Sequence, residues 1–496
     1  MPSDRNKNRN RDQNRKKMEF KIFGREVKTT KKSLATLATV LVLYILFLIW
    51  VGSWMGTFVI PFIIDNYTTR FIPWGWWKKS DNALLKKVMS WVDAIVFALI
   101  AVYFVHLYLF QNYVIPTSSL EKSLLVGDYL FVSKFNYGPR KPQTPLSMPL
   151  TQHTMPVIGG KSYSEAIQWD YERVPGLEDV KFGDIVVFNY PAGDVATTNP
   201  NVIDLHSICY AIGSELDPDN TPDNMPASEA WEVYAKQYGL GMDYIKEHPE
   251  SFGEVQHRPV DRRENYVKRC VGLPGNTLQI KDKTLYIDGE PMKQPKNVQF
   301  NYHVELTQAI PEALRRELDI SNEDLTVLYH TGLVPLTHEK YECLKNNSKL
   351  VKSISAVNHE STQGVYPLNG NTGWTIDNYG PVWIPKRGES IRLTMDNLAI
   401  YERPIVNYEG NTLEVRDGKI FINGAECDNY TFKMDYYWMM GDNRHNSADS
   451  RCWGFVPEDH IVGKPLFVWL SLDKDRGLFD GKIRWERIFR SVSSLD

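Results

Sequence analysis

The chain has 496 residues, with 57 Lys and Arg against 60 Asp and Glu, so its formal net charge at pH 7 is only −3. A chain of this length can fold as two domains or as one large domain with insertions. The near-neutral balance provides no overall positive field, which argues against nucleic acid as a partner. Charge is nevertheless uneven, because residues 1–32 hold twelve Lys and Arg against four Asp and Glu. We expect this basic arm to be disordered and to contact anionic lipid or the cytosol.

Two apolar runs follow the arm and predict a membrane anchor over residues 33–115. The first covers about residues 34–64, and the second covers about residues 91–110 with only Asp93 and His106 as interruptions. Each run is long enough to cross a hydrocarbon core of about 30 Å at a rise of about 1.5 Å per residue. The first run is too long for a cleavable signal peptide and lacks a small-residue cleavage site.

Basic residues lie on both sides of the first apolar run. The loop after it carries five of them: Arg70, Lys78, Lys79, Lys86 and Lys87. The positive-inside rule places both the arm and this loop on the cytoplasmic side, and one span between them cannot satisfy it twice. Either the first run folds as a hairpin or re-entrant segment, or the arm is exported despite its charge. In both cases the second run leads the rest of the chain to the outer face.

Short strand signals dominate the sequence after residue 115. Apolar runs at 129–132 and 185–188 each follow a Gly-Asp turn, which is typical of buried strands. The phrase Gly-Asn-Thr-Leu begins at residue 275 and again at residue 410, and each copy leads to a second apolar run. We interpret the two copies as similar β-hairpins that turn at a polar centre containing Asp.

Helical patterns are sparse and occur inside segments that interrupt the strand framework. Three short segments carry them: 228–238, 311–318 and 337–346. The fold predicted is mostly β, an antiparallel β-sheet catalytic domain over residues 116–480, anchored by N-terminal transmembrane helices. Large α+β insertions are expected at 192–262 and 292–408, and residues 481–496 are expected to form a C-terminal tail.

The cysteines are odd in number and widely spaced: Cys209, Cys270, Cys343, Cys427 and Cys452. No Cys or His spacing suggests a zinc site, and no metal or organic cofactor is expected. We expect Cys270 and Cys452 to be small buried thiols, and a disulfide between any two of the others stays open.

Ser119 is the first of the residues that carry chemistry. It lies five residues after Val114, and five residues extend at most about 17 Å, so its hydroxyl must lie near the bilayer surface. A serine hydroxyl needs a base before it can act as a nucleophile. By itself, a serine in a Pro-Thr-Ser-Ser loop is more often a turn former.

Lys268 can supply that base. In a strand, Tyr266, Lys268 and Cys270 share one face, whereas Val267 and Arg269 take the other. An aromatic ring and a thiol can desolvate the lysine, which lowers the pKa of its ammonium group and leaves an amine able to accept a proton. Arg269 cannot act in this way because a guanidinium stays protonated. Without Ser119 and the 441–451 segment described next, Lys268 would be interpreted as a surface lysine.

The third block, residues 441–451, is a glycine-containing loop rich in hydrogen-bonding side chains. Its acidic spacing does not match an EF-hand, which needs a closing bidentate Glu. The Ser447 hydroxyl can orient the amine of Lys268, and Asp449 can pair with Arg451 to hold the loop.

Together these blocks resemble those of the type I signal peptidases (leader peptidases), a family of bacterial membrane-bound Ser/Lys proteases. Residues 115–137 resemble the serine box of that family, and residues 183–188 resemble the strand that follows it. Residues 266–275 resemble the lysine box, and residues 441–457 resemble the last box. The four blocks occur in the order of the family.

The resemblance implies a role for each residue. Ser119 would attack the scissile carbonyl, Lys268 would be the general base, and Ser447 would position Lys268. The backbone N–H of Ser119 and the Thr117 hydroxyl would form an oxyanion hole, where one donor is worth about 2.7–4 kcal/mol. Two residues depart from the family pattern. Leu120 stands where the family usually has Met, and Lys122 stands where it usually has Pro, which affects the rigidity of the loop rather than its chemistry.

The implied function is that of a membrane-bound serine endopeptidase that removes N-terminal signal peptides from exported preproteins by cleaving after small residues. Its expected partners are those signal peptides and the lipid bilayer, with the protein translocation machinery as a further candidate. The implied location is the bacterial inner (cytoplasmic) membrane, as a multi-pass protein with its catalytic domain on the periplasmic or outer face.

Three alternative functions fit the sequence less well. A catalytically inactive membrane-anchored scaffold of the secretion machinery has no need for Ser119, Lys268 and Ser447 together. A self-cleaving Ser/Lys repressor-type protease is soluble and carries a DNA-binding module, which two membrane spans do not fit. Residues 119–122 match the Ser-x-x-Lys spacing of penicillin-interacting enzymes, but no Ser-Asp-Asn or Lys-Thr-Gly partner segment occurs.

Overall fold

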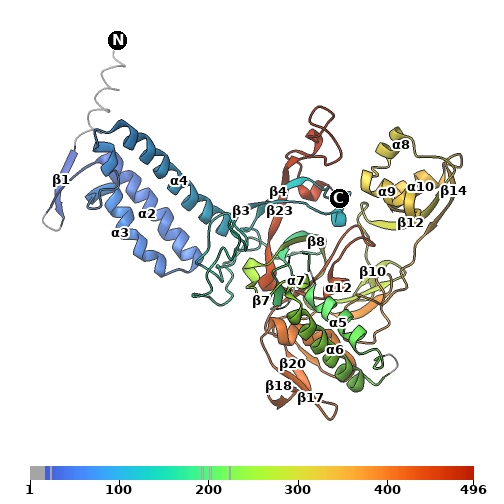
Figure 1. Ribbon diagram of the computed structural model, residues 1–496. Helices are drawn as coiled ribbons and strands as arrows, with labels where there is room; N and C mark the ends of the chain where they lie inside the picture. Colours follow the sequence, from blue (N-terminus) through green and yellow to red (C-terminus); the bar gives the residue numbers. More distant parts are fainter. Residues whose placement is uncertain are drawn as a thin grey trace. The chain divides into compact units, whose positions relative to one another are not determined.

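The computed structural model describes residues 17–22, 25–191, 193, 195–199, 201–202, 204–222 and 225–495 (Figure 1). The chain divides into two units. The first runs to Val105 and includes Glu172–Pro175, and the second contains the rest of the chain from His106 onward.

The first unit begins with a strand pair inside the basic arm. β1 (Lys17–Ile22) and β2 (Arg25–Thr30) pair antiparallel, from Lys17 opposite Thr30 to Ile22 opposite Arg25. This part of the arm is described as a strand pair, whereas its composition alone predicts disorder. Charged and apolar residues alternate along β1, which is the period of a strand. Residues 1–16 and 23–24 lie outside the described residues.

The first apolar run folds as a helical hairpin. α2 (Lys31–Val51) ends at Gly52, whose φ of 67° places it in the left-handed region. The chain then returns through three short helices: η1 (Met55–Val59), α3 (Ile60–Ile64) and η2 (Asp65–Thr69). The Ser33 hydroxyl donates to the carbonyl of Tyr67 at 2.9 Å, so the end of this segment lies beside the start of α2. This arrangement corresponds to the hairpin that the sequence left as one of two possibilities.

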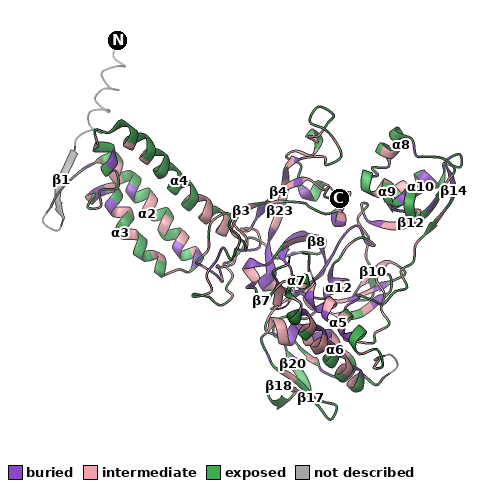
Figure 2. Cartoon of the chain, in the orientation of Figure 1, coloured by how far each residue is buried: buried purple, intermediate pink, exposed green. Residues whose placement is uncertain are grey.

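The second apolar run forms α4 (Ala83–Tyr108), which follows η3 (Trp76–Lys79). Within the described residues, α2 and α4 are long and apolar enough to cross a membrane. The side chains of α4 are largely exposed (Figure 2), and Ile95 and Phe97 are 53% and 74% exposed. Apolar side chains left uncovered along a whole helix suit lipid better than water.

The second unit is built on a seven-stranded antiparallel sheet that includes the strand carrying Lys268 and the strand that precedes Ser119. Its strand order is β22-β21-β8-β5-β23-β4-β3. In that order the strands are Val456–Pro457, Tyr436–Met440, Asn265–Gly272, Ile185–Asn189, Ile461–Ser471, Asp128–Ser133 and Phe110–Val114. The two strands expected at 129–132 and 185–188 are thus β4 and β5.

β5 explains how this sheet is covered on both faces. All five of its residues are buried. Ile185 and Val187 join one apolar cluster, whereas Val186 and Phe188 join another. Since successive side chains of a strand point to opposite faces, the sheet lies between two cores.

The two hairpins predicted from the repeated phrase are both present. β9 (Thr277–Lys281) pairs with β10 (Thr284–Ile287), and β17 (Leu413–Arg416) pairs with β18 (Lys419–Ile422). The two residues at each turn have positive φ, 45° and 68° in the first hairpin and 50° and 71° in the second. Such values match a type I′ turn, whose twist suits a two-residue hairpin.

Short strands extend or flank these hairpins. They are β11 (Glu290–Pro291), β15 (Tyr379–Trp383), β16 (Ser390–Arg392), β19 (Ala425–Glu426) and β20 (Asn429–Thr431). α11 (Met395–Arg403) with η6 (Pro404–Tyr408) and α12 (Ser450–Trp453) complete the region. Several of these elements and the two hairpins contribute to one large apolar cluster, which includes Leu278, Leu398 and Trp438.

The first insertion carries a helix pair between two short strands. Its elements are β6 (Val195–Thr197), α5 (Leu205–Leu216), α6 (Ala227–Glu247), α7 (Pro249–Phe252) and β7 (Val255–His257). The helix expected at 228–238 is the first half of α6. α5 had no counterpart in the sequence prediction.

The second insertion contains a small α+β lobe, residues 297–356, which we call the insert subdomain (yellow in Figure 1). Its sheet has the order β13-β12-β14, namely Leu333–Thr337, Gln299–Leu306 and Val351–Ala356. Its helices are α8 (Glu312–Glu317), α9 (Asn322–Thr331) and α10 (His338–Lys345). An apolar cluster of its own includes Val334, Leu336 and Leu344. α8 and α10 confirm the helices expected at 311–318 and 337–346.

The end of the described chain returns to the central sheet. Arg487 pairs with Asp128 of β4, with Nη2 and Oδ2 at 2.6 Å, and Ser491 bridges to Phe467 of β23. The antiparallel sheet of the predicted fold is confirmed, but the expected dominance of strands is not. Helical residues outnumber strand residues in the described part of the chain, because α2, α4, α5 and α6 are long.

Candidate active site

Ser119 and Lys268 meet in the interior of the second unit. Ser119 lies in η4 (Ser118–Leu120), the short turn that follows β3, and Lys268 lies near the middle of β8. The Nζ atom of Lys268 is 2.5 Å from the Oγ atom of Ser119. Ser119 is 9% exposed and Lys268 is 3% exposed, so the contact is shielded from solvent. Two residues 149 positions apart in the sequence are thus in direct hydrogen-bond contact.

Burial sets the protonation of Lys268. It lowers the pKa of the amine to about 8, although nearby Asp449 acts in the opposite direction. Removal from water disfavours the charged ammonium, and a neighbouring carboxylate favours it. At mildly alkaline pH a large fraction of Lys268 is therefore the neutral amine, which can accept a proton from a hydroxyl.

The residues expected to flank the lysine lie on its face of β8. The Nζ atom of Lys268 lies 6.0 Å from the ring centre of Tyr266. Cys270 is fully buried and packs in the same apolar cluster as Tyr266. Burial raises the pKa of the Cys270 thiol to about 12, so this thiol is protonated and serves as packing.

Asp449 and Arg451 form a buried ion pair that closes the 441–451 loop. Nε and Nη2 of Arg451 donate to Oδ1 and Oδ2 of Asp449 at 2.9 and 2.8 Å. The backbone N–H of Gly441 also donates to Asp449 at 3.0 Å. Burial alone would raise the pKa of Asp449, but Arg451 and these hydrogen bonds lower it overall. The carboxylate therefore stays charged close to Lys268.

The same loop is joined directly to the serine turn. The backbone N–H of Asn443 donates to the carbonyl of Ser119 at 3.1 Å. A Cβ atom at Gly441 would lie 2.6 Å from that carbonyl oxygen and 2.2 Å from Oγ of Ser447. Only glycine allows this approach.

Ser447 lies beside Gly441, but its hydroxyl makes no hydrogen bond. The Oγ atom is buried, and no described residue lies within hydrogen-bonding distance with suitable geometry, Lys268 included. A buried hydroxyl without a partner is unusual and costs free energy. Thr117 is exposed and precedes η4 as its N-cap residue without a side-chain capping bond. Its hydroxyl is therefore not used to stabilise the turn.

The sequence prediction missed the partner of Arg269, the residue next to the lysine. Arg269 points to the other face of β8 and binds Asp442 in two places, at 2.9 and 2.8 Å. The hydroxyl of Ser123 donates to the same carboxylate at 2.6 Å. This network ties the lysine strand, the serine loop and the 441–451 loop together. The available signal was an arginine inside a strand that had to be buried, which requires a carboxylate partner.

A second missed residue, Gln299, comes from the insert subdomain. Its backbone N–H donates to the carbonyl of Asp442 at 2.9 Å, and its own carbonyl accepts from the N–H of Arg444 at 3.0 Å. Its side-chain Nε2 donates to the carbonyl of Glu121 at 3.1 Å. One buried glutamine at the start of β12 therefore contacts both loops of the candidate site.

His445 of the 441–451 loop forms a hydrogen bond with Asp377, which lies outside that loop. The backbone N–H of Asn301 donates to Nδ1 of His445 at 3.1 Å, so the ring proton is on Nε2, which lies 2.8 Å from Oδ1 of Asp377. Asp377 also accepts from the backbone N–H of His359 at 2.9 Å. Nothing in the spacing of these residues marks them as partners.

All five cysteines are free thiols. Among the described residues there is no cluster of three or more His, Cys, Asp or Glu side chains that could hold a metal ion.

Comparison with known proteins assigns the class of this chain, which is that of a peptidase. Residues 88–331 and 388–470 match the family described as "Signal peptidase, peptidase S26". These two segments contain more than half of the chain and include Ser119, Lys268 and the 441–451 loop. The chain belongs to this signal peptidase family.

Several proteins named signal peptidase I are similar to the chain. One from Buchnera aphidicola (subspecies Acyrthosiphon pisum) is 27% identical over 244 residues, which cover 47% of this chain and 58% of that protein. One from Haemophilus influenzae is 23% identical over 416 residues, 84% of this chain and 79% of that protein. One from Helicobacter pylori is 45% identical over 71 residues, but these cover only 12% of this chain and 24% of that protein. High identity is thus confined to short stretches.

Proposed function

We propose that the chain is a membrane-anchored serine endopeptidase that removes signal peptides from exported preproteins, with Ser119 as nucleophile and Lys268 as general base. The observation that carries the proposal is the buried 2.5 Å contact between Nζ of Lys268 and Oγ of Ser119. Family membership supports the reaction class, and the lowered pKa of Lys268 supports its role as a base.

The proposed reaction has two stages. The neutral amine of Lys268 accepts the hydroxyl proton while Oγ of Ser119 bonds to the scissile carbonyl carbon. The C–N bond then breaks, the ammonium returns its proton to the leaving amine, and the signal peptide stays attached as an ester. Water, deprotonated by Lys268, attacks this ester, and the signal peptide leaves as a carboxylate while Ser119 is regenerated.

Donors beside the serine would stabilise the tetrahedral intermediate. The backbone N–H of Ser119 and the Thr117 hydroxyl are the proposed oxyanion hole. The freedom of the Thr117 side chain from capping supports this assignment, because a capping hydroxyl would face the turn instead.

We propose that Ser447 orients the amine of Lys268 when substrate is bound. Its unpaired buried hydroxyl supports the idea, because the oxygen has a free lone pair and a free proton. Asp449 and Arg451 would hold the loop that presents it. Cleavage after small residues is the proposed specificity, as signal peptides end in such residues.

The proposed placement is in a bacterial inner membrane. α4 would cross the bilayer, and the α2–α3 hairpin would enter and leave it on the cytoplasmic side. The lysines between the hairpin and α4 would then face the cytoplasm, as the positive-inside rule requires. The second unit would lie on the outer face, where it meets exported chains and, as a further candidate partner, the translocation machinery.

The test is cleavage of a reporter preprotein with alanine at positions −1 and −3 by the full chain in lipid vesicles. We expect the wild type to cleave it and Ser119→Ala and Lys268→Ala to be inactive while folded. Ser118→Ala and Lys281→Ala are matched controls, since neither side chain forms a hydrogen bond with Ser119 or Lys268 among the described residues, and they should retain activity. A folded wild type that leaves the reporter intact would favour the scaffold alternative instead.

A further inference from the structure

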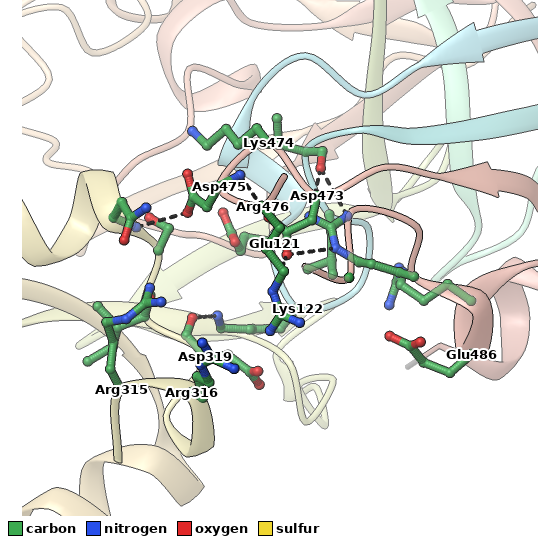
Figure 3. A pocket seen from close by; sticks show the side chains of 18 of the residues that line it. Glu121, Lys122, Arg315, Arg316, Asp319, Asp473, Lys474, Asp475, Arg476 and Glu486 are labelled. Carbon is green, nitrogen blue, oxygen red and sulfur yellow. Dashed lines mark hydrogen bonds and ion pairs between the residues drawn. The ribbon is translucent and has the colours of Figure 1, made fainter. Parts of the chain in front are cut away.

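A large polar cleft opens next to the candidate active site, between the insert subdomain and the rest of the second unit (Figure 3). Its volume is about 940 Å³. This lies toward the upper end of the range of roughly 300–1,000 Å³ that is usual for ligand pockets. A cleft of this size can hold several residues of an extended chain rather than one side chain.

Three segments form the walls of the cleft. Lys122 follows the serine turn, and its Nζ atom donates to the carbonyl of Asp319 in the insert subdomain at 2.5 Å. Figure 3 shows these two side chains on one wall of the cleft, with the Asp473–Arg476 segment on another. Lys474 pairs with Glu323 of the insert subdomain at 2.7 Å. These two contacts connect the insert subdomain to the serine loop and to the Asp473–Arg476 segment.

The contact between Lys122 and Asp319 depends on the backbone conformation of Lys122. Its φ is 74°, a conformation that proline cannot adopt. Proline is the residue expected here from the resemblance to other signal peptidases. The departure from the family pattern therefore has a structural role in this chain, because it joins the serine loop to the insert subdomain.

The cleft is continuous with the position of the nucleophile. Glu121 lines it and is only two residues from Ser119, which corresponds to at most about 7 Å between their Cα atoms. The Glu121 side chain makes no ion pair within the described part of the chain. Burial raises the pKa of its carboxyl group. A chain bound across Ser119 would reach the cleft within two or three residues.

The lining of the cleft is too polar to bind an apolar segment. Ten basic and eight acidic side chains line the cleft among 27 residues. Burying apolar chain against so many charges would remove their water without replacing its hydrogen bonds. Four basic side chains of the lining form no ion pair with a described carboxylate: Lys122, Lys296, Lys340 and Arg490. Six acidic ones form no ion pair with a described cation, so the cleft offers unpaired charges of both signs: Glu121, Asp319, Glu339, Asp475, Asp480 and Glu486.

From this contiguity and polarity we propose that the cleft binds the segment of the preprotein that lies on the C-terminal side of the scissile bond. This inference rests on the proposed function. The signal peptide is apolar before its cleavage site, so it cannot occupy such a cleft, whereas the hydrophilic start of the mature chain can. The unpaired charges of both signs favour a polar or charged segment from about the third position after the cut.

The experiment compares two substrates with one signal peptide, one ending two residues after the cut and one continuing to the eighth residue with Asp at positions +4 to +6. We expect the full-length wild type in vesicles to have the higher kcat/KM on the long substrate. The double variant Lys296→Glu, Arg490→Glu should lose about tenfold on the long substrate and nothing on the short one. It should gain activity on a long substrate with Lys at the same positions.

A matched control is Lys349→Glu with Lys419→Glu, two exposed lysines outside the cleft. This pair should not change the ratio between the substrates. Equal effects of the cleft variant on long and short substrates, or no effect on the long one, would overturn the proposal. Failure of the wild type to cut either substrate would instead refute the proposed function, so the two failures are distinguishable.

Discussion

Arg269 and Asp442 form a buried two-point ion pair, with Nε and Nη2 of Arg269 at 2.9 and 2.8 Å from the carboxylate oxygens. The two side chains are 3% and 1% exposed. The pair fixes the strand that carries Lys268 to the loop that contacts the carbonyl of Ser119. Positioning of the proposed nucleophile and base thus depends on a pair that takes no part in the chemistry.

Asp442→Asn is expected to destabilise the protein by about 3–5 kcal/mol, because it leaves the buried Arg269 without its charged partner. Urea unfolding of the solubilised protein measures the change. The matched control is Glu414→Gln, which breaks the exposed pair with Arg416 and should cost less than about 1 kcal/mol. Equal effects of the two substitutions would contradict the role of the buried pair.

The pH dependence of cleavage should follow the pKa of Lys268. Its value of about 8 means that the amine is mostly protonated and inactive at pH 6 and mostly neutral at pH 9. We expect kcat/KM to rise with pH through this range and then level off. Lys268→Arg should be inactive throughout, since its guanidinium stays protonated. A flat profile between pH 6 and 9 would exclude Lys268 as the base.

The same lowered pKa predicts a stability cost. The unfolded chain binds a proton at Lys268 up to about pH 10.5, whereas the folded chain releases it near pH 8. Stability should therefore rise with pH between these values, and below pH 8 the folded state bears the whole penalty. Lys268→Met should be inactive yet more stable at pH 7, by at most about 3 kcal/mol. Thermal unfolding at pH 7 and 10 checks this, and a less stable variant at pH 7 would refute it.

Ser447→Ala separates orientation of the base from stability. The Ser447 hydroxyl makes no hydrogen bond with a described residue, so its removal should leave the free energy of unfolding unchanged or slightly higher. If Ser447 orients Lys268 during catalysis, kcat should fall by at least about tenfold with KM unchanged. Steady-state kinetics on the reporter preprotein gives both values. Unchanged kcat would remove Ser447 from the mechanism.

Local patterns in the sequence were sufficient for part of the fold and part of the candidate site. The repeated phrase at 275 and 410 predicted two hairpins, because turn residues and strand period are encoded within fifteen residues. The face shared by Tyr266, Lys268 and Cys270 also follows from the period of two. That Ser119 reaches Lys268 followed from resemblance to a family, since nothing local joins residues 149 positions apart.

Partners that depend on tertiary placement could not be predicted in this way. Asp377 lies in an insertion and contacts His445 only because the chain returns to the loop after the insert subdomain. The helix α5 (Leu205–Leu216) was not predicted from the sequence. The dominance of strands was overestimated because α5 was not predicted, only the first half of α6 was predicted, and the two long anchor helices add to the helical total.

The three contacts of Gln299 make the base of the insert subdomain part of the catalytic framework. Its helices have a separate core, and the carbonyl of Asp319 between α8 and α9 accepts a hydrogen bond from Lys122 of the serine loop. A graft that keeps this contact can change the rest of the lobe, whereas one that shifts the first residue of β12 would misalign two loops at once. A replacement of the insert subdomain that is meant to alter substrate choice should begin after residue 301 rather than before it.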